Sequence, residues 1–293
     1  MSDKTRLVNT GRHPERFEGA VNTPVFRGST IVHGSMAEWE DKKRRRAADE
    51  HGASTYGRYG MATHHALEEA VAELEGGYRS LVYPSGLAAC VTALTALLAA
   101  GDHVLLSDSA YSPTRGFVQR VLGRFGVAVD IYDPRAGAGL EDLIRPETKV
   151  VYVESPGSET FEVQDIPSIA AIAHRHGAKG VMDNTWGTPL FFTPFEHGVD
   201  VSIQAATKYI VGHSDALLGI VTCTKAVWPL IKRTTEDMGQ TAGPDDIYLA
   251  LRGLRTLDVR LQQHWKNGVE VASWLETRPE VERVLHPALP SHP

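Results

Sequence analysis

The sequence has 293 residues, of which 42% are hydrophobic and 23% are charged, a composition typical of a globular protein with a sizeable core. Its formal net charge of -6 argues against a surface built mainly to bind nucleic acid or an anionic membrane. Residues 1–16 are polar and lack the apolar stretch of a signal peptide, and the longest apolar run, residues 87–100, is too short to span a bilayer. We therefore expect a cytoplasmic protein with no nucleic-acid or membrane partner.

Residues 1–60 are polar and glycine-rich, without sustained periodicity. This predicts an N-terminal arm that is extended apart from a short helix near residues 36–49. The basic run at residues 42–46 could bind phosphate groups. The run is preceded by the acidic residues Glu38, Glu40 and Asp41, which favour instead a solvated helix face with mixed charges.

From residue 64 onward, short β-branched or apolar runs alternate with segments of helical length. This alternation predicts an α/β domain, residues 61–243, around a mostly parallel seven-stranded sheet whose strands are buried on both faces. The expected strands are 81–83, 104–106, 127–132, 150–154, 180–183, 199–203 and 218–223. The expected helices are about 64–75, 86–100, 112–125 and 165–176.

The helix at 86–100 has the clearest pattern, with larger apolar residues at helical spacing and alanines filling the other side. Such a helix is buried nearly all round. Cys90 within it and Cys223 at the end of the last strand are the only two cysteines. Their apolar surroundings indicate small core residues rather than a disulfide or a metal site.

The pattern after residue 244 is helical. Pro244 followed by two aspartates is a plausible helix start, and an apolar stripe follows at Leu254, Leu257, Leu261 and Trp265. We expect residues 244–293 to form a helical connection and the beginning of a C-terminal domain, most of which would be missing from this sequence.

The first feature that could carry chemistry is the turn at residues 83–87, where a strand ends and the buried helix begins. Ser85 is a good N-cap, and the free N–H groups of Gly86 and Leu87 could bind an anion such as a phosphate at the helix N-terminus. A strand–glycine–helix turn is more often only a turn, so this feature is weak on its own.

The second feature is Asp183, at the carboxyl end of an apolar strand. Ligands in open α/β sheets bind beyond that end, and a carboxylate there could pair with a protonated pyridine nitrogen. The alternative is an ordinary helix cap or loop aspartate.

The third feature is Lys208, which lies in a stretch of small and apolar residues after another predicted strand. Burial would lower the pKa of such an amine and make it a usable nucleophile toward an aldehyde. The alternative is a surface lysine at a strand end.

The stretch from Ser202 to Asp215 resembles the lysine signature of the Cys/Met-metabolism enzymes that depend on pyridoxal 5′-phosphate (PLP). Four further segments match this family in order along the chain, at residues 56–58, 154–158, 183–186 and 286–290. The resemblance implies the aspartate-aminotransferase fold, PLP fold type I, and a PLP cofactor. Ala205, Ala206 and Trp186 are most similar to the cystathionine β-lyase branch, whereas several γ-enzymes carry serine and phenylalanine at the positions of Ala205 and Trp186.

The resemblance also implies roles for single residues. Within one subunit, the implied cofactor contacts are Lys208, Asp183, Gly86, Leu87, Thr207 and Tyr111. Lys208 would bind PLP covalently and later move protons, Asp183 would hold the pyridine nitrogen, and Tyr111 would stack on the ring. Gly86, Leu87 and Thr207 would bind the phosphate. No metal site is expected, because the His64–His65 pair more plausibly begins a helix.

Tyr56 and Arg58 lie on the arm, and the resemblance implies that they reach the phosphate bound by a neighbouring subunit. Arginine suits that task through its planar set of donors. We therefore expect a homodimer with shared active sites, assembled into a homotetramer.

The implied reaction is β-elimination of L-cystathionine to L-homocysteine, pyruvate and ammonia, a step of methionine biosynthesis, with Tyr56 or Tyr111 taking the proton of the substrate amine. A γ-lyase or γ-synthase of the same family is the first alternative, and a non-catalytic protein with the PLP fold is the second. Two departures from the family matter. Ala205 offers no hydroxyl, so we expect one contact fewer to the phosphate. The family's C-terminal domain, which holds the arginine for the substrate carboxylate, is expected to be absent, and the missing arginine favours the second alternative.

Overall fold

The computed structural model describes residues 3–50 and 52–292. Seven strands form one sheet in the order β1-β7-β6-β5-β4-β2-β3. Their bounds are β1 Arg79–Tyr83, β2 His103–Ser107, β3 Ala128–Tyr132, β4 Thr148–Glu154, β5 Lys179–Asp183, β6 Val201–Gln204 and β7 Gly219–Cys223. From β6 to β3 all neighbours pair in parallel, whereas β7 pairs antiparallel with both β1 and β6. The predicted strands and the mostly parallel sheet are confirmed.

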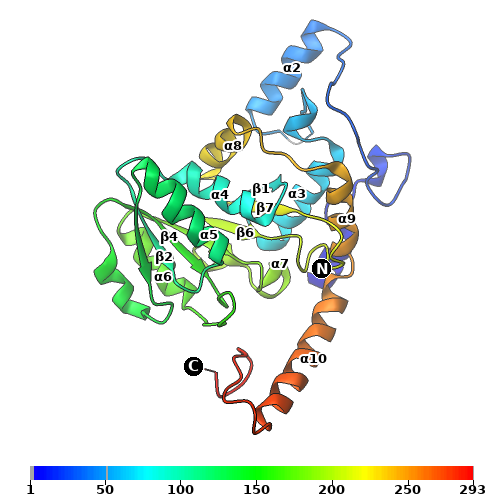
Figure 1. Ribbon diagram of the computed structural model, residues 1–293. Helices are drawn as coiled ribbons and strands as arrows, with labels where there is room; N and C mark the ends of the chain where they lie inside the picture. The colour runs from blue at the N-terminus through cyan, green and yellow to red at the C-terminus, as the bar shows by residue number, and fades with distance from the viewer. Residues whose placement is uncertain (1–2, 51, 293) are drawn as a thin grey trace.

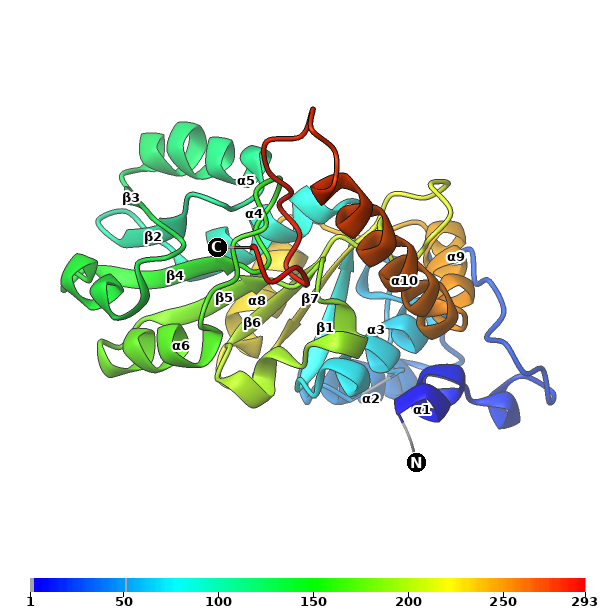
Figure 2. The ribbon, with the colours of Figure 1, turned by 90° about the horizontal axis from the view of Figure 1, so that it is seen from below.

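Helices cover both faces of this sheet (Figures 1 and 2). The longer ones are α3 Ala62–Glu75, α4 Gly86–Leu97, α6 Ile166–Arg175, α8 Trp228–Asp237, α9 Pro244–Leu254 and α10 Leu257–Glu276. On one face, α4 and α8 pack over Val221, and on the other α3 packs over Ile220 and α6 over Val151. Consecutive β7 residues thus enter opposite cores, because side chains alternate along a strand.

Helix α4 begins where predicted, since the Ser85 hydroxyl accepts a hydrogen bond from the Ala88 N–H at 3.1 Å. Its inner residues, Cys90 among them, are buried against the sheet, but Leu97 is only half-buried and Leu87 is exposed, so the helix is not buried nearly all round as predicted. The helix expected at 112–125 is less regular. It divides into α5 Ser112–Phe117, a π-helical turn Val118–Leu122 and a 3-10 turn Gly123–Phe125.

The C-terminal stripe is only partly as predicted. Leu254, Leu257 and Leu261 are at most 4% exposed, whereas Trp265 is 57% exposed and makes an edge contact with Phe191. The expectation for Trp265 is wrong because α10 runs past the edge of the sheet domain (Figure 1). Three short elements were not anticipated, namely α1 Asp3–Asn9, α7 Thr188–Phe191 and the 3-10 turn Gly137–Leu143, and neither was α8.

The arm is more structured than expected. Helix α1 docks on α3, with Leu7 buried and the Thr10 hydroxyl donating to Glu73 at 2.5 Å. Helix α2, Met36–Ala47, confirms the helix expected near 36–49, has no buried residue, and projects away from the sheet domain (Figure 1). No described helix is long and apolar enough to cross a membrane.

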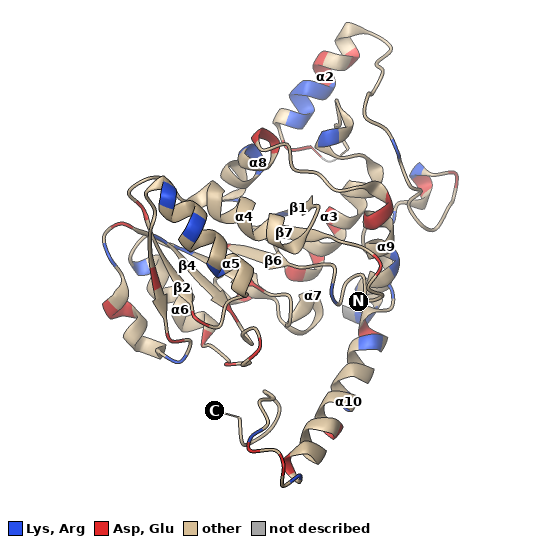
Figure 3. Ribbon diagram, viewed as in Figure 1, with Lys and Arg blue, Asp and Glu red and all other residues tan. Residues whose placement is uncertain are grey.

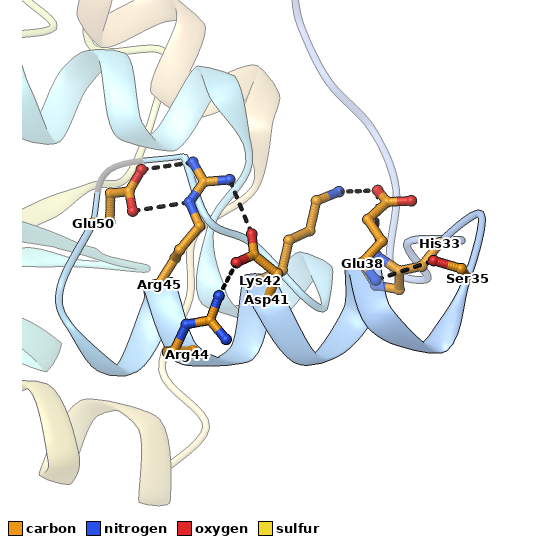
Figure 4. Close-up of polar contacts among 8 residues, drawn as sticks. All are labelled: His33, Ser35, Glu38, Asp41, Lys42, Arg44, Arg45 and Glu50. Carbon is orange, nitrogen blue, oxygen red and sulfur yellow. Dashed lines mark hydrogen bonds and ion pairs between the residues drawn. The ribbon is translucent and has the colours of Figure 1, made fainter.

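Helix α2 carries charges of both signs, with acidic residues in its first half and basic residues in its second half (Figure 3). Lys42 pairs with Glu38 at 3.2 Å, and Arg45 pairs with Glu50 at 2.6 Å. Asp41 accepts from Arg44 and also lies 3.8 Å from Arg45 (Figure 4). These pairs confirm the solvated helix face with mixed charges.

Candidate active site

A cavity of about 1000 Å³ opens beyond the carboxyl ends of the parallel strands. Ligands bind at this edge in open α/β sheets because the loops after successive strands converge there. The residues that line it and matter below are Glu154, Thr185, Trp186, Thr207, Lys208 and Arg260. They come from the ends of β4, β5 and β6 and from α10, so the sheet topology itself assembles the site.

Asp183 ends β5 and Glu154 ends β4, and the two are direct partners in the parallel register. Their carboxyl groups therefore lie on the same face of the sheet. Both residues are almost fully buried, with 6% and 9% of their surface exposed. Burial raises the pKa of Asp183, and burial together with the charge of Asp183 raises the pKa of Glu154 to about 8. At least one of the two carboxyls therefore keeps its proton near neutral pH.

Asp183 is held in place by the segment that follows β5. Its Oδ1 accepts the N–H of Thr185 at 3.0 Å, and the Thr185 hydroxyl in turn accepts the N–H of Ala205 at 2.8 Å. The end of β5 is thereby tied to the segment that carries Lys208. The structure places Asp183 where the sequence predicted, at the buried carboxyl end of a strand.

Lys208 lies on a turn after β6. Its N–H donates to the Ala205 carbonyl at 2.9 Å, and its own carbonyl accepts from Gly212 at 2.8 Å. The side chain lines the cavity but is exposed. The expectation of a buried amine is therefore wrong for this chain, because β6 ends at Gln204 and Lys208 lies beyond it on the open side of the cavity.

The first turn of α4 lies close to Ala205, in the segment that leads to Lys208. A Cβ at Gly86 would lie 2.6 Å from the Cβ of Ala205, so only glycine allows this approach. Leu87 is 36% exposed. The Thr207 hydroxyl lines the cavity and accepts the N–H of Leu218 at 2.8 Å. The three residues expected at the phosphate are thus brought to one side of the Lys208 turn.

Tyr111 is tied to the site through its backbone. It directly precedes α5, and its N–H donates to the Oε2 of Glu154 at 2.7 Å. The ring is 46% exposed, which leaves a face free for stacking.

Tyr56 and Arg58 are not brought to this cavity within the chain. The Arg58 guanidinium donates to the Glu236 carbonyl at 2.6 Å and to the Tyr59 hydroxyl at 3.1 Å. Tyr56 packs edge-on against Tyr59 and is 43% exposed. Their service to a neighbouring subunit stays a prediction.

Two residues of the site had no role assigned from the sequence. Glu154 belongs to a matching segment, and its position at a strand end was a usable signal. Arg260 lines the cavity and donates to the carbonyls of Tyr209 at 2.7 Å and Gly253 at 2.8 Å, which braces the turn after Lys208. Nothing in the sequence pattern distinguishes Arg260 from other helix-surface arginines.

These residues fit a PLP group. The cavity offers the Lys208 amine. The N-terminus of α4, whose Gly86 closely approaches Ala205, and the buried Asp183 carboxyl, beside Glu154, lie next to residues that line it. Residues 4–293 match the family model described as Cys/Met metabolism PLP-dependent enzyme. The chain belongs to this family.

Individual relatives agree with that membership. The chain is similar to cystathionine beta-lyase from Bordetella avium, with 44% identity over 96% of this chain and 70% of the relative. It is similar to cystathionine beta-lyase MetC from Escherichia coli, with 42% identity over 99% of this chain and 74% of the relative. Cystathionine gamma-lyase from Homo sapiens is 38% identical over 99% of this chain and 69% of the relative.

The fold is matched as well. The solved structure of metB from Corynebacterium glutamicum superposes with a TM-score of 0.91, at 30% identity, over 100% of this chain and 73% of that one. The PLP fold type I, the PLP cofactor and the assignment as a PLP-dependent carbon–sulfur lyase, all predicted from the sequence, are confirmed.

Proposed function

We propose that this PLP-dependent enzyme catalyses the β-elimination of L-cystathionine to L-homocysteine, pyruvate and ammonia. The observation that carries the proposal is the Lys208 amine, which reaches into a cavity at the edge of the sheet where Asp183 is buried. The similarity to two cystathionine beta-lyases over nearly the whole chain supports the same reaction.

In this proposal Lys208 would hold PLP covalently, and its amine would be free once the substrate amine is bound. Asp183 would hold the protonated pyridine nitrogen, and Gly86, Leu87 and Thr207 would hold the phosphate. When bound, PLP supplies an electron sink for the negative charge that develops on the substrate α-carbon.

The proton transfers fall to groups at the cavity. Tyr111, or Tyr56 from a partner, accepts the proton of the incoming substrate amine. The freed Lys208 amine then removes the α-proton. Cleavage of the Cβ–S bond releases L-homocysteine, and the remaining three-carbon unit leaves and takes up water to give pyruvate and ammonia.

A γ-elimination would require a second proton to be removed, at Cβ of the substrate. Two residues favour β-elimination over this alternative. Ala205 stands where several γ-enzymes carry serine, and Trp186 stands where they carry phenylalanine. Trp186 lines the cavity and makes an edge contact with Phe161 at 6.5 Å between ring centroids, so this wall is shaped by the larger indole.

Product analysis tests the proposal. The PLP-loaded protein is incubated with L-cystathionine, and the keto acid is identified by chromatography. We expect pyruvate together with L-homocysteine. Formation of 2-oxobutanoate would show a γ-lyase, and the absence of any keto acid would show a non-catalytic protein.

We further propose that the active protein is a homo-oligomer in which the arm serves a neighbouring site. The support is that neither Tyr56 nor Arg58 lines the cavity of its own chain. Arg58 donates to Glu236 of α8, and Tyr56 packs on Tyr59 of the arm. Sedimentation of the PLP-loaded protein tests the assembly, and a monomer would contradict it.

A further inference from the structure

Glu154 stands out among the groups at the cavity because its carboxyl makes several contacts yet has no place in the proposed reaction. We propose that Glu154 is a positioning residue, whose carboxyl group holds the backbone of Tyr111 and the loop at residues 155–158 in register beside Asp183. This inference rests on the proposed function, since it takes Tyr111 as the residue that stacks on the cofactor.

The hydrogen bonds of Glu154 join two loops that are distant in sequence. Its Oε2 accepts the N–H of Tyr111 at 2.7 Å, and its Oε1 accepts the hydroxyl of Ser158 at 2.5 Å. Tyr111 follows β2, whereas Ser158 follows β4. Removal of this one side chain would release both loops at the edge where the cavity opens.

The two loops are packed too closely to shift independently. The N–H of Ser158 donates to the Ser109 carbonyl at 2.8 Å. A Cβ at Gly157 would lie 2.3 Å from the Cβ of Ser109, so the loop backbone directly contacts the segment that leads to Tyr111. The position of the Tyr111 ring therefore depends on what holds residues 155–158.

The groups around Glu154 act on its ionisation in both directions. Burial and the charge of Asp183 on β5 raise its pKa. The hydrogen bonds from the Ser158 hydroxyl and the Tyr111 N–H lower the pKa, as does Arg115 on α5, but burial and Asp183 outweigh them. The other titratable groups that interact with it are Tyr152 on β4 and Cys90 on α4, both neutral at physiological pH because burial raises their pKa. With Asp183 charged, Glu154 keeps its proton until the pH nears its pKa of about 8.

A glutamine at this position would keep the acceptor for the Tyr111 N–H but could not ionise. An alanine would lose both hydrogen bonds. The two variants therefore separate positioning from charge, and Glu147→Gln is a matched control, because Glu147 is exposed at the opposite end of the same strand.

The experiment measures PLP binding rather than turnover. Wild type, Glu154→Gln, Glu154→Ala and the control are titrated with PLP at pH 7, and the visible circular dichroism of the bound cofactor is recorded. We expect Glu154→Gln and the control to bind within about twofold of wild type with the same dichroic band, because one well-placed acceptor is retained. Glu154→Ala should bind about tenfold more weakly, with a reduced band, because Tyr111 is no longer fixed.

Three results overturn the proposal. Equal binding and equal bands for Glu154→Ala and wild type would remove the positioning role. A Glu154→Gln variant as defective as Glu154→Ala would show that the charged form is needed. If Glu154→Ala does not fold, Ser158→Ala, which removes one of the two hydrogen bonds, should weaken the band in the same direction, and an unchanged band would refute the proposal. Wild-type protein that binds PLP but yields no pyruvate would count against the proposed reaction alone.

Discussion

The carboxyl-end edge of the sheet and the N-terminal arm are built in opposite ways. At the edge, Asp183 and Glu154 are almost fully buried, and backbone hydrogen bonds fix each neighbouring loop. On the arm, α2 has no buried residue, and its charged side chains pair mainly with one another (Figures 3 and 4). Both regions carry proposed functional residues.

The difference bears on what each region can do alone. The edge takes its geometry from the register of the strands within one chain, so a single chain can position Asp183 and Glu154. Helix α1 of the arm docks on α3, whereas the part of the arm around α2 and Arg58 is held to the sheet domain by polar contacts with α8, such as those of Arg58 and Lys232. We infer that the residues at the edge determine the reaction and that the residues of the arm add affinity for PLP. The predictions below test this division.

The largest effect is expected for Lys208→Ala, which should abolish covalent attachment of PLP and all turnover, because no other lysine among the described residues lines the cavity. Borohydride reduction of the wild-type protein followed by peptide mapping should find the pyridoxyl group on Lys208. Lys179, at the opposite end of β5, and Lys225, beyond β7, are internal controls. A label on either of them would place the chemistry away from this edge.

Asp183→Ala should leave PLP attached but lower turnover by about 10²–10³-fold, the loss typical of one removed electrostatic group at a reacting centre. Steady-state kinetics with L-cystathionine measure this. Asp133→Asn is the control, since Asp133 pairs with Arg135 on the surface, and it should match wild type. Full activity of Asp183→Ala would remove the buried carboxyl from the mechanism.

Arg58→Ala tests the arm. Loss of one charge-assisted contact should weaken PLP retention by about 1.5–3 kcal/mol, measured by equilibrium dialysis, without the complete loss expected at Lys208. At a PLP concentration too low to load Arg58→Ala, both Arg58→Ala and Lys208→Ala should be inactive, and mixing their subunits should restore part of the activity, because one site of each hybrid dimer has both residues intact. Proven hybrids without recovery would assign the arm to its own chain's site.

The contrast between the two regions also sets how far the sequence could predict the site. Asp183 and the Ser85–Gly86 turn were found because a strand end and a helix cap are visible in local patterns. The role of Glu154 was not, because only the register of β4 against β5 brings it beside Asp183. The exposure of Lys208 depends on the turn after Gln204, and periodicity does not encode turn geometry. Helix α8 was missed because its start, Trp228 and a proline, lacks a polar cap.

Glu154 gives the edge a pH-dependent stability. Its pKa is raised from 4.5 to about 8 on folding, so between these values the folded chain holds a proton that the unfolded chain has released. The free energy of unfolding therefore falls as the pH rises through this window and levels off above it. Glu154→Gln should lack this contribution. From pH 5 to 9, its Tm should therefore fall by at least about 3 °C less than the Tm of the wild type. Thermal unfolding from pH 5 to 9 measures it, and parallel curves for both proteins would contradict the assignment.

The smallest effect is expected for Arg44 on α2. Arg46, on the same helix, is the variant with which it is compared. Arg44 is 75% exposed and pairs with Asp41 of its own helix, so Arg44→Ala should change Tm by less than about 2 °C.

Arg46 pairs with Glu236 of α8 at 2.7 Å and lies 3.4 Å from the centroid of the Tyr59 ring. Arg46→Ala should therefore destabilise the protein more than Arg44→Ala, and it should also weaken PLP retention if Arg58, beside Tyr59, depends on this docking. Thermal unfolding and dialysis on both variants decide the point. Equal values for the two would mean that the contacts of Arg46 with Glu236 and Tyr59 add no stability.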